Sequence, residues 1–153
     1  MSKFQRDGLR QLLAQGWAGE AIPAGFTVRA LLLEGASAYV PDADDVLVAD
    51  IAADELTTVQ APAYARVQVT GLDVNVDALD DLVVLTSGTI AFPNLAAASG
   101  TVTINACVIY LDSDGATDAT RPILEIVTFT PTALDSTTFN VAPPVEGLGA
   151  ISV

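Results

Sequence analysis

The sequence predicts a mainly β fold, an antiparallel β-sandwich or open β-barrel with one N-terminal α-helix. Three observations favour this class: turn-forming residues recur at short intervals from Phe26 onward, runs rich in branched and aromatic residues lie between them, and only one segment has a helical pattern. A length of 153 residues suits one domain with its own core. We therefore expect a single domain over residues 1–153, with a helix or arm at 1–16 and a β-rich body at 26–153.

The helix is predicted from Ser2 to about Gln15. Its apolar side chains fall on one broad side, Ser2 is placed to cap its start, and Gly16 is placed to end it. The helix also carries half of the chain's six basic residues, which form either a solvated outer face or a basic patch that docks against an acidic neighbouring subunit. These residues are Lys3, Arg6 and Arg10.

An antiparallel hairpin in the middle of the sheet is predicted between Thr101 and Thr130. Two β-rich runs, Val102–Leu111 and Ile123–Thr130, flank a polar loop with the composition of a turn. The central hairpin is therefore the segment around which we expect the rest of the sheet to form. The loop contains Asp112, Asp114, Gly115, Asp118 and Arg121.

The remaining strands are shorter. Ala65–Thr70 alternates, with Ala65, Val67 and Val69 on one face, which predicts a half-buried antiparallel strand. Leu82–Leu85 and Thr89–Phe92 are predicted to form a hairpin or a bulged strand, and residues 45–56 a short surface helix or turn. The other predicted strands are Phe26–Leu33, Leu72–Val76, Thr137–Val141 and Leu148–Val153.

The charge of the chain limits its partners. There are 19 acidic residues against 6 basic ones, a net charge of −13, so we expect neither direct nucleic-acid binding nor attraction to anionic lipid. Hydrophobic residues make up 51% and charged residues 16%, which is a low charged fraction for a monomer that must solvate its whole surface. The apolar runs are far shorter than the ~20 residues that span a bilayer, and the first residues do not resemble a secretory signal. We expect synthesis in the cytosol.

Catalytic chemistry is not indicated. The chain has no histidine, which excludes histidine triads, histidine metal sites and imidazole bases. Its one cysteine, Cys107, lies in a predicted strand and is expected to be a buried small hydrophobe. We find no nucleophile elbow and no dinucleotide fingerprint, and we predict no enzyme activity, no cofactor and no metal.

Two acidic loops have residues that could bind a cation. Residues 112–118 resemble the start of a calcium loop, but Ala116 and Ile123 occupy positions that an EF-hand gives to ligands. A hairpin turn whose Asp side chains bond the local backbone is favoured, with a calcium site of another type as the alternative. A surface turn is likewise favoured for Asp42, Asp44 and Asp45, and a protective role at a strand edge for Asp80 and Asp81.

The order of segments resembles a family of small structural proteins of tailed bacteriophages. These have a short leucine-containing helix, a first strand, a Pro-Asp acidic loop, a short acidic segment, and then an aromatic stretch that enters an alternating strand. The chain departs from this pattern at Gly19–Gly25 and Pro143–Pro144. The matching segments are Phe4–Gly16, Phe26–Glu34, Tyr39–Asp42 with Asp50, Ile51 and Glu55, Tyr64–Arg66, Thr89–Phe92, Ala106–Leu111 with Pro122–Leu124, Phe139–Val141 and Gly147–Ile151.

The resemblance implies a virion component, first of all a decoration (cement) protein on the capsid exterior, made in the host cytoplasm. Its partners would be the major capsid protein and copies of itself, with a trimer expected from symmetric assembly. The alternatives are a tail or baseplate component and an acidic-loop module that binds calcium or carbohydrate. The residues predicted to contact a partner are Phe4, Arg6, Arg10 and Trp17.

Overall fold

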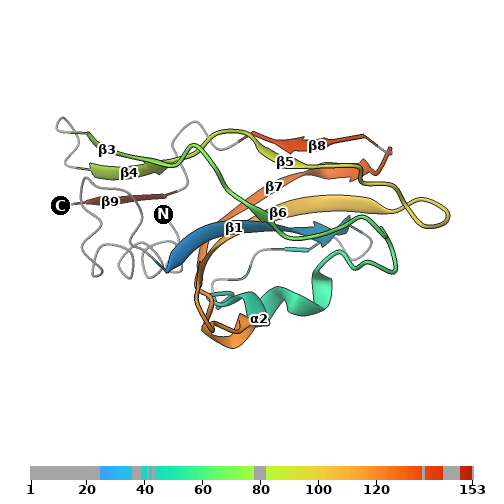
Figure 1. Cartoon of the computed structure of the whole chain (residues 1–153), viewed down its shortest axis with the longest axis horizontal. Helices are drawn as coiled ribbons and strands as arrows, with labels where there is room; N and C mark the ends of the chain where they lie inside the picture. Colours follow the sequence, from blue (N-terminus) through green and yellow to red (C-terminus); the bar gives the residue numbers. More distant parts are fainter. Residues whose placement is uncertain are drawn as a thin grey trace.

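The protein consists of antiparallel sheets in layers (Figure 1). The computed structural model describes residues 25–35, 39–40, 42, 44–77, 82–135, 137–142 and 149–152. Within them a four-stranded sheet forms the middle layer, a two-stranded sheet covers one of its faces, and a short helical segment covers the other. The predicted mainly β class is confirmed. The sheets of the described residues stay open and form no closed barrel, and the predicted N-terminal helix lies outside those residues.

The middle sheet has the strand order β2-β1-β6-β7, and every neighbouring pair is antiparallel. The predicted central hairpin is confirmed as β6 and β7, and β6 lies inside the sheet between β1 and β7. A register shift between Ile104 and Ala106 interrupts the pairing with the last third of β7. The strands are β1 (Phe26–Glu34), β2 (Val67–Gln68), β6 (Thr103–Ser113) and β7 (Ile123–Ala133).

Hydrophobic cores lie on both faces of the middle sheet, which explains why β1 and β6 are almost continuously apolar. Along β1, Leu32 packs into one core, while Leu31 and Leu33 pack into the other. The first core is shared with Ile90, Phe92 and Val141 of the two-stranded sheet, and the second with Val48 and Ile51 of the helical segment. A change on either face of these strands therefore disturbs a packed core.

Two smaller sheets complete the described fold. β5 (Ile90–Phe92) pairs with β8 (Phe139–Val141) above the middle sheet, and a three-stranded sheet lies at one end of the molecule (Figure 1). The prediction that Leu82–Leu85 and Thr89–Phe92 form a hairpin or a bulged strand is wrong, because β4 and β5 belong to different sheets: β4 pairs with β3 and β9, and β5 with β8. The three-stranded sheet consists of β3 (Asp73–Asp77), β4 (Leu82–Thr86) and β9 (Gly149–Ser152).

The helical segment matches the short surface helix predicted within residues 45–56. It consists of α2 (Val48–Ile51) and the 3-10 turn η2 (Ala52–Asp54). Asp50 supports its start, because one of its carboxylate oxygens accepts hydrogen bonds from the backbone N–H groups of Val46, at 3.1 Å, and Leu47, at 2.8 Å. The segment is held against the middle sheet by its buried side chains, Val48 and Ile51.

The predicted strand Ala65–Thr70 is shorter in the structure, where only the two residues of β2 are paired. Ala65 is exposed, contrary to the prediction, whereas Val69 is buried as expected.

Cys107 is fully buried on β6, as predicted, and burial raises the pKa of its thiol well above the ordinary value. The thiol is therefore held in its protonated, unreactive form.

Candidate functional site

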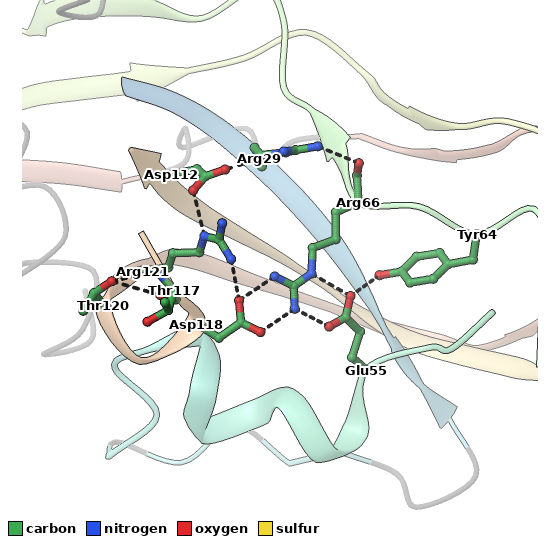
Figure 2. A network of polar contacts seen from close by, with 9 residues as sticks. All are labelled: Arg29, Glu55, Tyr64, Arg66, Asp112, Thr117, Asp118, Thr120 and Arg121. Carbon is green, nitrogen blue, oxygen red and sulfur yellow. Dashed lines mark hydrogen bonds and ion pairs between the residues drawn. The ribbon is translucent and has the colours of Figure 1, made fainter. Parts of the chain in front are cut away.

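Arg66 joins its own segment to two others, one that ends 11 residues earlier at Glu55 and one 52 residues later at Asp118 (Figure 2). Its Nε donates a hydrogen bond at 2.8 Å to Oε1 of Glu55, the residue that follows η2. Its Nη1 and Nη2 donate to the two carboxylate oxygens of Asp118, at 2.6 and 2.8 Å. Asp118 begins η3 (Asp118–Thr120), the 3-10 turn in the loop between β6 and β7. The guanidinium group thus binds one carboxylate along each of two of its edges, through pairs of N–H groups, which is the geometry that arginine favours.

Arg121 extends the contacts toward the end of β6. Its Nη1 donates to Asp118 at 2.8 Å and its Nε to Asp112 at 2.7 Å. Arg29 of β1 approaches Asp112 from the other side at 3.5 Å and donates from Nη2 to the backbone carbonyl of Arg66 at 3.2 Å. We call this set the arginine–carboxylate cluster; it consists of Arg29, Arg66, Arg121, Glu55, Asp112 and Asp118.

Two tyrosines border the cluster. The Tyr64 hydroxyl donates to Oε1 of Glu55 at 2.8 Å and accepts a hydrogen bond from the backbone N–H of Leu32 at 3.2 Å. Burial, followed by the nearby Glu55 carboxylate, raises the pKa of Tyr64. The ring of Tyr110 lies 5.6 Å from the Arg66 guanidinium carbon, within cation–π range. These contacts anchor the polar cluster to the apolar cores.

The arrangement is typical of a structural clamp rather than a reaction site. Its three cations face three carboxylates, so the cluster is electrically balanced. The hydrogen bonds from Arg66, and then from Arg121, lower the pKa of Asp118 to about 2. The hydrogen bond to Glu55 is the main cause of the raised pKa of Arg66. Both shifts favour the charged, paired forms, so the cluster fastens the η2 segment and the β6–β7 loop to the middle sheet.

Acid should weaken this clamp through Asp118. The pKa of Asp118 is lower in the folded protein than its ordinary value of 3.8, so its stabilisation is complete above about pH 4 and is lost as the pH falls through about 2. Because the side chain is 32% exposed, we expect about 1–2 kcal/mol from this carboxylate. The difference in unfolding free energy between the wild type and Asp118→Asn, measured from pH 6 to pH 2, should shrink below pH 4. A constant difference would contradict the assignment.

The acidic loop differs from its prediction. Its Asp side chains were expected to bond the local backbone, which is wrong for Asp112 and Asp118, because both bind arginines. This also counts against the calcium alternative, since two of the loop's carboxylates already face cations. Within the part of the chain that the structure describes, no three Cys, Asp or Glu side chains lie close enough together to hold a metal ion.

The second acidic turn is as predicted. The backbone N–H of Asp44 donates a hydrogen bond to Oδ1 of Asp42 at 3.0 Å, and the backbone N–H of Asp42 donates one to Oδ2 of Asp45 at 3.0 Å. The Tyr39 hydroxyl also donates to Asp45. Asp80, Asp81 and the predicted partner contacts lie outside the described residues. The predicted partner contacts are Phe4, Arg6, Arg10 and Trp17.

A groove between β7 and β8 is a second candidate site, and sequence reasoning missed it. It has a volume of about 340 Å³, and the rings of Phe129 and Phe139 meet in it at a centroid distance of 5.5 Å. Both strands were predicted, but they belong to two different sheets. No local sequence pattern indicates that strands of different sheets lie next to each other. An available sequence signal was the lack of charged residues from Ile126 to Leu134 and from Thr137 to Val145.

Comparison of the chain with protein-family models, curated proteins and solved structures finds no match. Among the described residues, no helix has the length and apolar character needed to cross a membrane.

Proposed function

We propose that the protein is a non-catalytic structural component of a tailed-bacteriophage virion, and specifically a decoration protein on the outside of the capsid. The observation that carries the proposal is the use of arginine in the described fold. Arg29, Arg66 and Arg121 are its basic residues, and each is paired with carboxylates of the same chain. No arginine of this set is left to bind a phosphate.

The described surface therefore presents carboxylates, and its three arginines are engaged with carboxylates of the same chain. Exposed carboxylates come from several segments: Asp42, Asp44, Asp50, Asp114 and Asp135. Such a surface repels nucleic acid and keeps the free protein soluble. It suits a protein that packs against other proteins on the side of a shell facing away from the genome. The sequence resemblance supports the same role.

The contact with the shell is proposed to involve the N-terminal segment. Lys3, Arg6 and Arg10 are the basic residues that the cluster does not contain, and Phe4 and Trp17 add aromatic side chains to the same segment. Interfaces are enriched in aromatic residues and arginine. The proposal therefore assigns partner binding to Phe4, Arg6, Arg10 and Trp17, with the major capsid protein as the partner.

Quantitative mass spectrometry on separated heads and tails of the parent virion tests the role directly. We expect many copies per particle in the head fraction, because a decoration protein repeats with the shell lattice. Enrichment with tails would instead assign the protein to the tail or baseplate. Absence from both fractions would refute a virion role and direct attention to carbohydrate or calcium binding.

The assignment of the N-terminal segment can be tested by cosedimentation with heads that lack the protein. We expect the double variant Arg6→Gln, Arg10→Gln to bind less and to lose most of the salt dependence of binding. The double variant Gln60→Glu, Gln68→Glu lowers the net charge equally but changes the β-rich body, and it should bind like the wild type. Equal losses in the two variants would contradict a specific contact.

A further inference from the structure

The groove between β7 and β8 has the side chains of a protein contact. Phe129 and Phe139 are each only half-buried, although large aromatic side chains contribute most when water is fully excluded from them. Aromatic side chains in a partly open pocket are the usual centre of a protein interface. The groove is lined mainly by Val127, Phe129 and Thr132 of β7 and by Phe139, Asn140 and Val141 of β8.

The charge of the groove indicates what kind of partner it suits. None of its lining residues can carry a charge, although the whole chain has a net charge of −13. A basic partner would be attracted to the carboxylates elsewhere on the surface. A partner that is itself strongly acidic can approach closely only where neither surface is charged. A second copy of this chain is such a partner.

The strands on both sides of the groove have free edges in the described part of the fold. Among the described strands, β7 is the outer strand of the middle sheet, and β8 pairs only with β5. Beyond Phe129, the outer part of β7 is exposed: Thr130, Pro131, Thr132 and Ala133. Pro131 has no N–H to donate, so a continuous sheet across two copies is disfavoured, and contact through side chains is favoured.

We propose that the β7–β8 groove is the surface through which copies of this chain associate. The same edges would meet around a symmetry axis, and the contact would bury the phenylalanine pair. The proposal gives a location to the self-association that accompanies the capsid role. Self-association is tested on the isolated protein and the capsid role on virions. Either proposal can therefore fail while the other stands.

The test compares two substitutions that turn an exposed amide into a carboxylate. Asn140→Asp places a negative charge in the groove of every copy, whereas Gln68→Glu places one on β2, at the opposite edge of the middle sheet. Sedimentation equilibrium should show an oligomer for the wild type. We expect Asn140→Asp to raise its dissociation constant about tenfold or more, and Gln68→Glu to leave the constant unchanged. Thr132→Asp, exposed on the other side of the groove, should act like Asn140→Asp.

Three results would overturn the proposal. The first is a wild type that stays monomeric at its highest soluble concentration. The second is an oligomer that none of the groove substitutions weakens, because the contact would then lie elsewhere. The third is equal weakening by Asn140→Asp and Gln68→Glu, which would reflect net charge alone. If the wild type is monomeric and Asn140→Asp instead lowers binding to heads, the groove meets the shell and not another copy.

Discussion

Replacing Phe92 with alanine should lower the free energy of unfolding by about 3–5 kcal/mol, the usual cost of removing a fully buried phenylalanine. The side chain is completely buried, and it packs from β5 into the core shared with Leu32 and Leu124. Only three residues of β5 pair with β8, so backbone hydrogen bonds alone hold this layer weakly. Urea unfolding followed by fluorescence or circular dichroism measures the loss.

Ala91 provides the matched control, because it is exposed on the same strand between Ile90 and Phe92. Ala91→Ser should change the unfolding free energy by no more than about 0.5 kcal/mol. A loss below about 1 kcal/mol for Phe92→Ala would mean that the β5–β8 layer contributes little to the core. Such a result would contradict the layered packing described above.

The second large effect is expected at Arg66. Arg66→Met should cost about 2–4 kcal/mol, because it leaves the Glu55 and Asp118 carboxylates without the guanidinium between them. The estimate lies below that for a fully buried pair because the Arg66 side chain is 21% exposed. Arg66→Lys should recover little of the loss, since an ammonium cannot bond both carboxylates with a planar fork. Urea unfolding at neutral pH again provides the measurement.

Arg29 is the control for the charge alone. Its side chain is 39% exposed and its ion pair with Asp112 is longer, at 3.5 Å, so Arg29→Met should cost no more than about 1 kcal/mol. Adding Glu55→Gln to Arg66→Met should restore part of the stability, because it removes the carboxylate that has lost its arginine, whereas Asp118 still pairs with Arg121. Equal losses for the two arginine variants would argue against a special role for Arg66.

The elements of the fold were more predictable than their pairing. β1, β6 and β7 follow from long runs rich in branched and aromatic residues, which are typical of strands in a buried sheet. The partners of β4 and β5 could not be derived in this way. A loop of three residues between them favours a hairpin, yet tertiary packing places β4 beside β9 and β5 beside β8, which come much later in the chain.

The arginine–carboxylate cluster shows the same limit at the level of side chains. The alternating pattern put Arg66 on the face opposite Val67, and the turn composition put Asp118 in a loop, both from local information. Their hydrogen bonds join positions separated by 52 residues, which composition cannot indicate. One clue was present in the sequence: in a chain with few arginines and many carboxylates, an arginine within a strand segment has many possible partners.

The strand order of the middle sheet has a consequence for the time at which the chain can fold. Both neighbours of β1 come later in the sequence, and its main partner β6 pairs Ser113 with Phe26. Closing so long a loop costs entropy before any contact compensates for it, whereas β6 and β7 are joined by a short loop. On the ribosome, β1 therefore lacks its main partner until β6 has been synthesised, and the core residues that β6 contributes cannot yet cover Leu31, Leu32 and Leu33. An apolar strand without its partner is prone to aggregate, so shielding β1 during synthesis should favour correct folding.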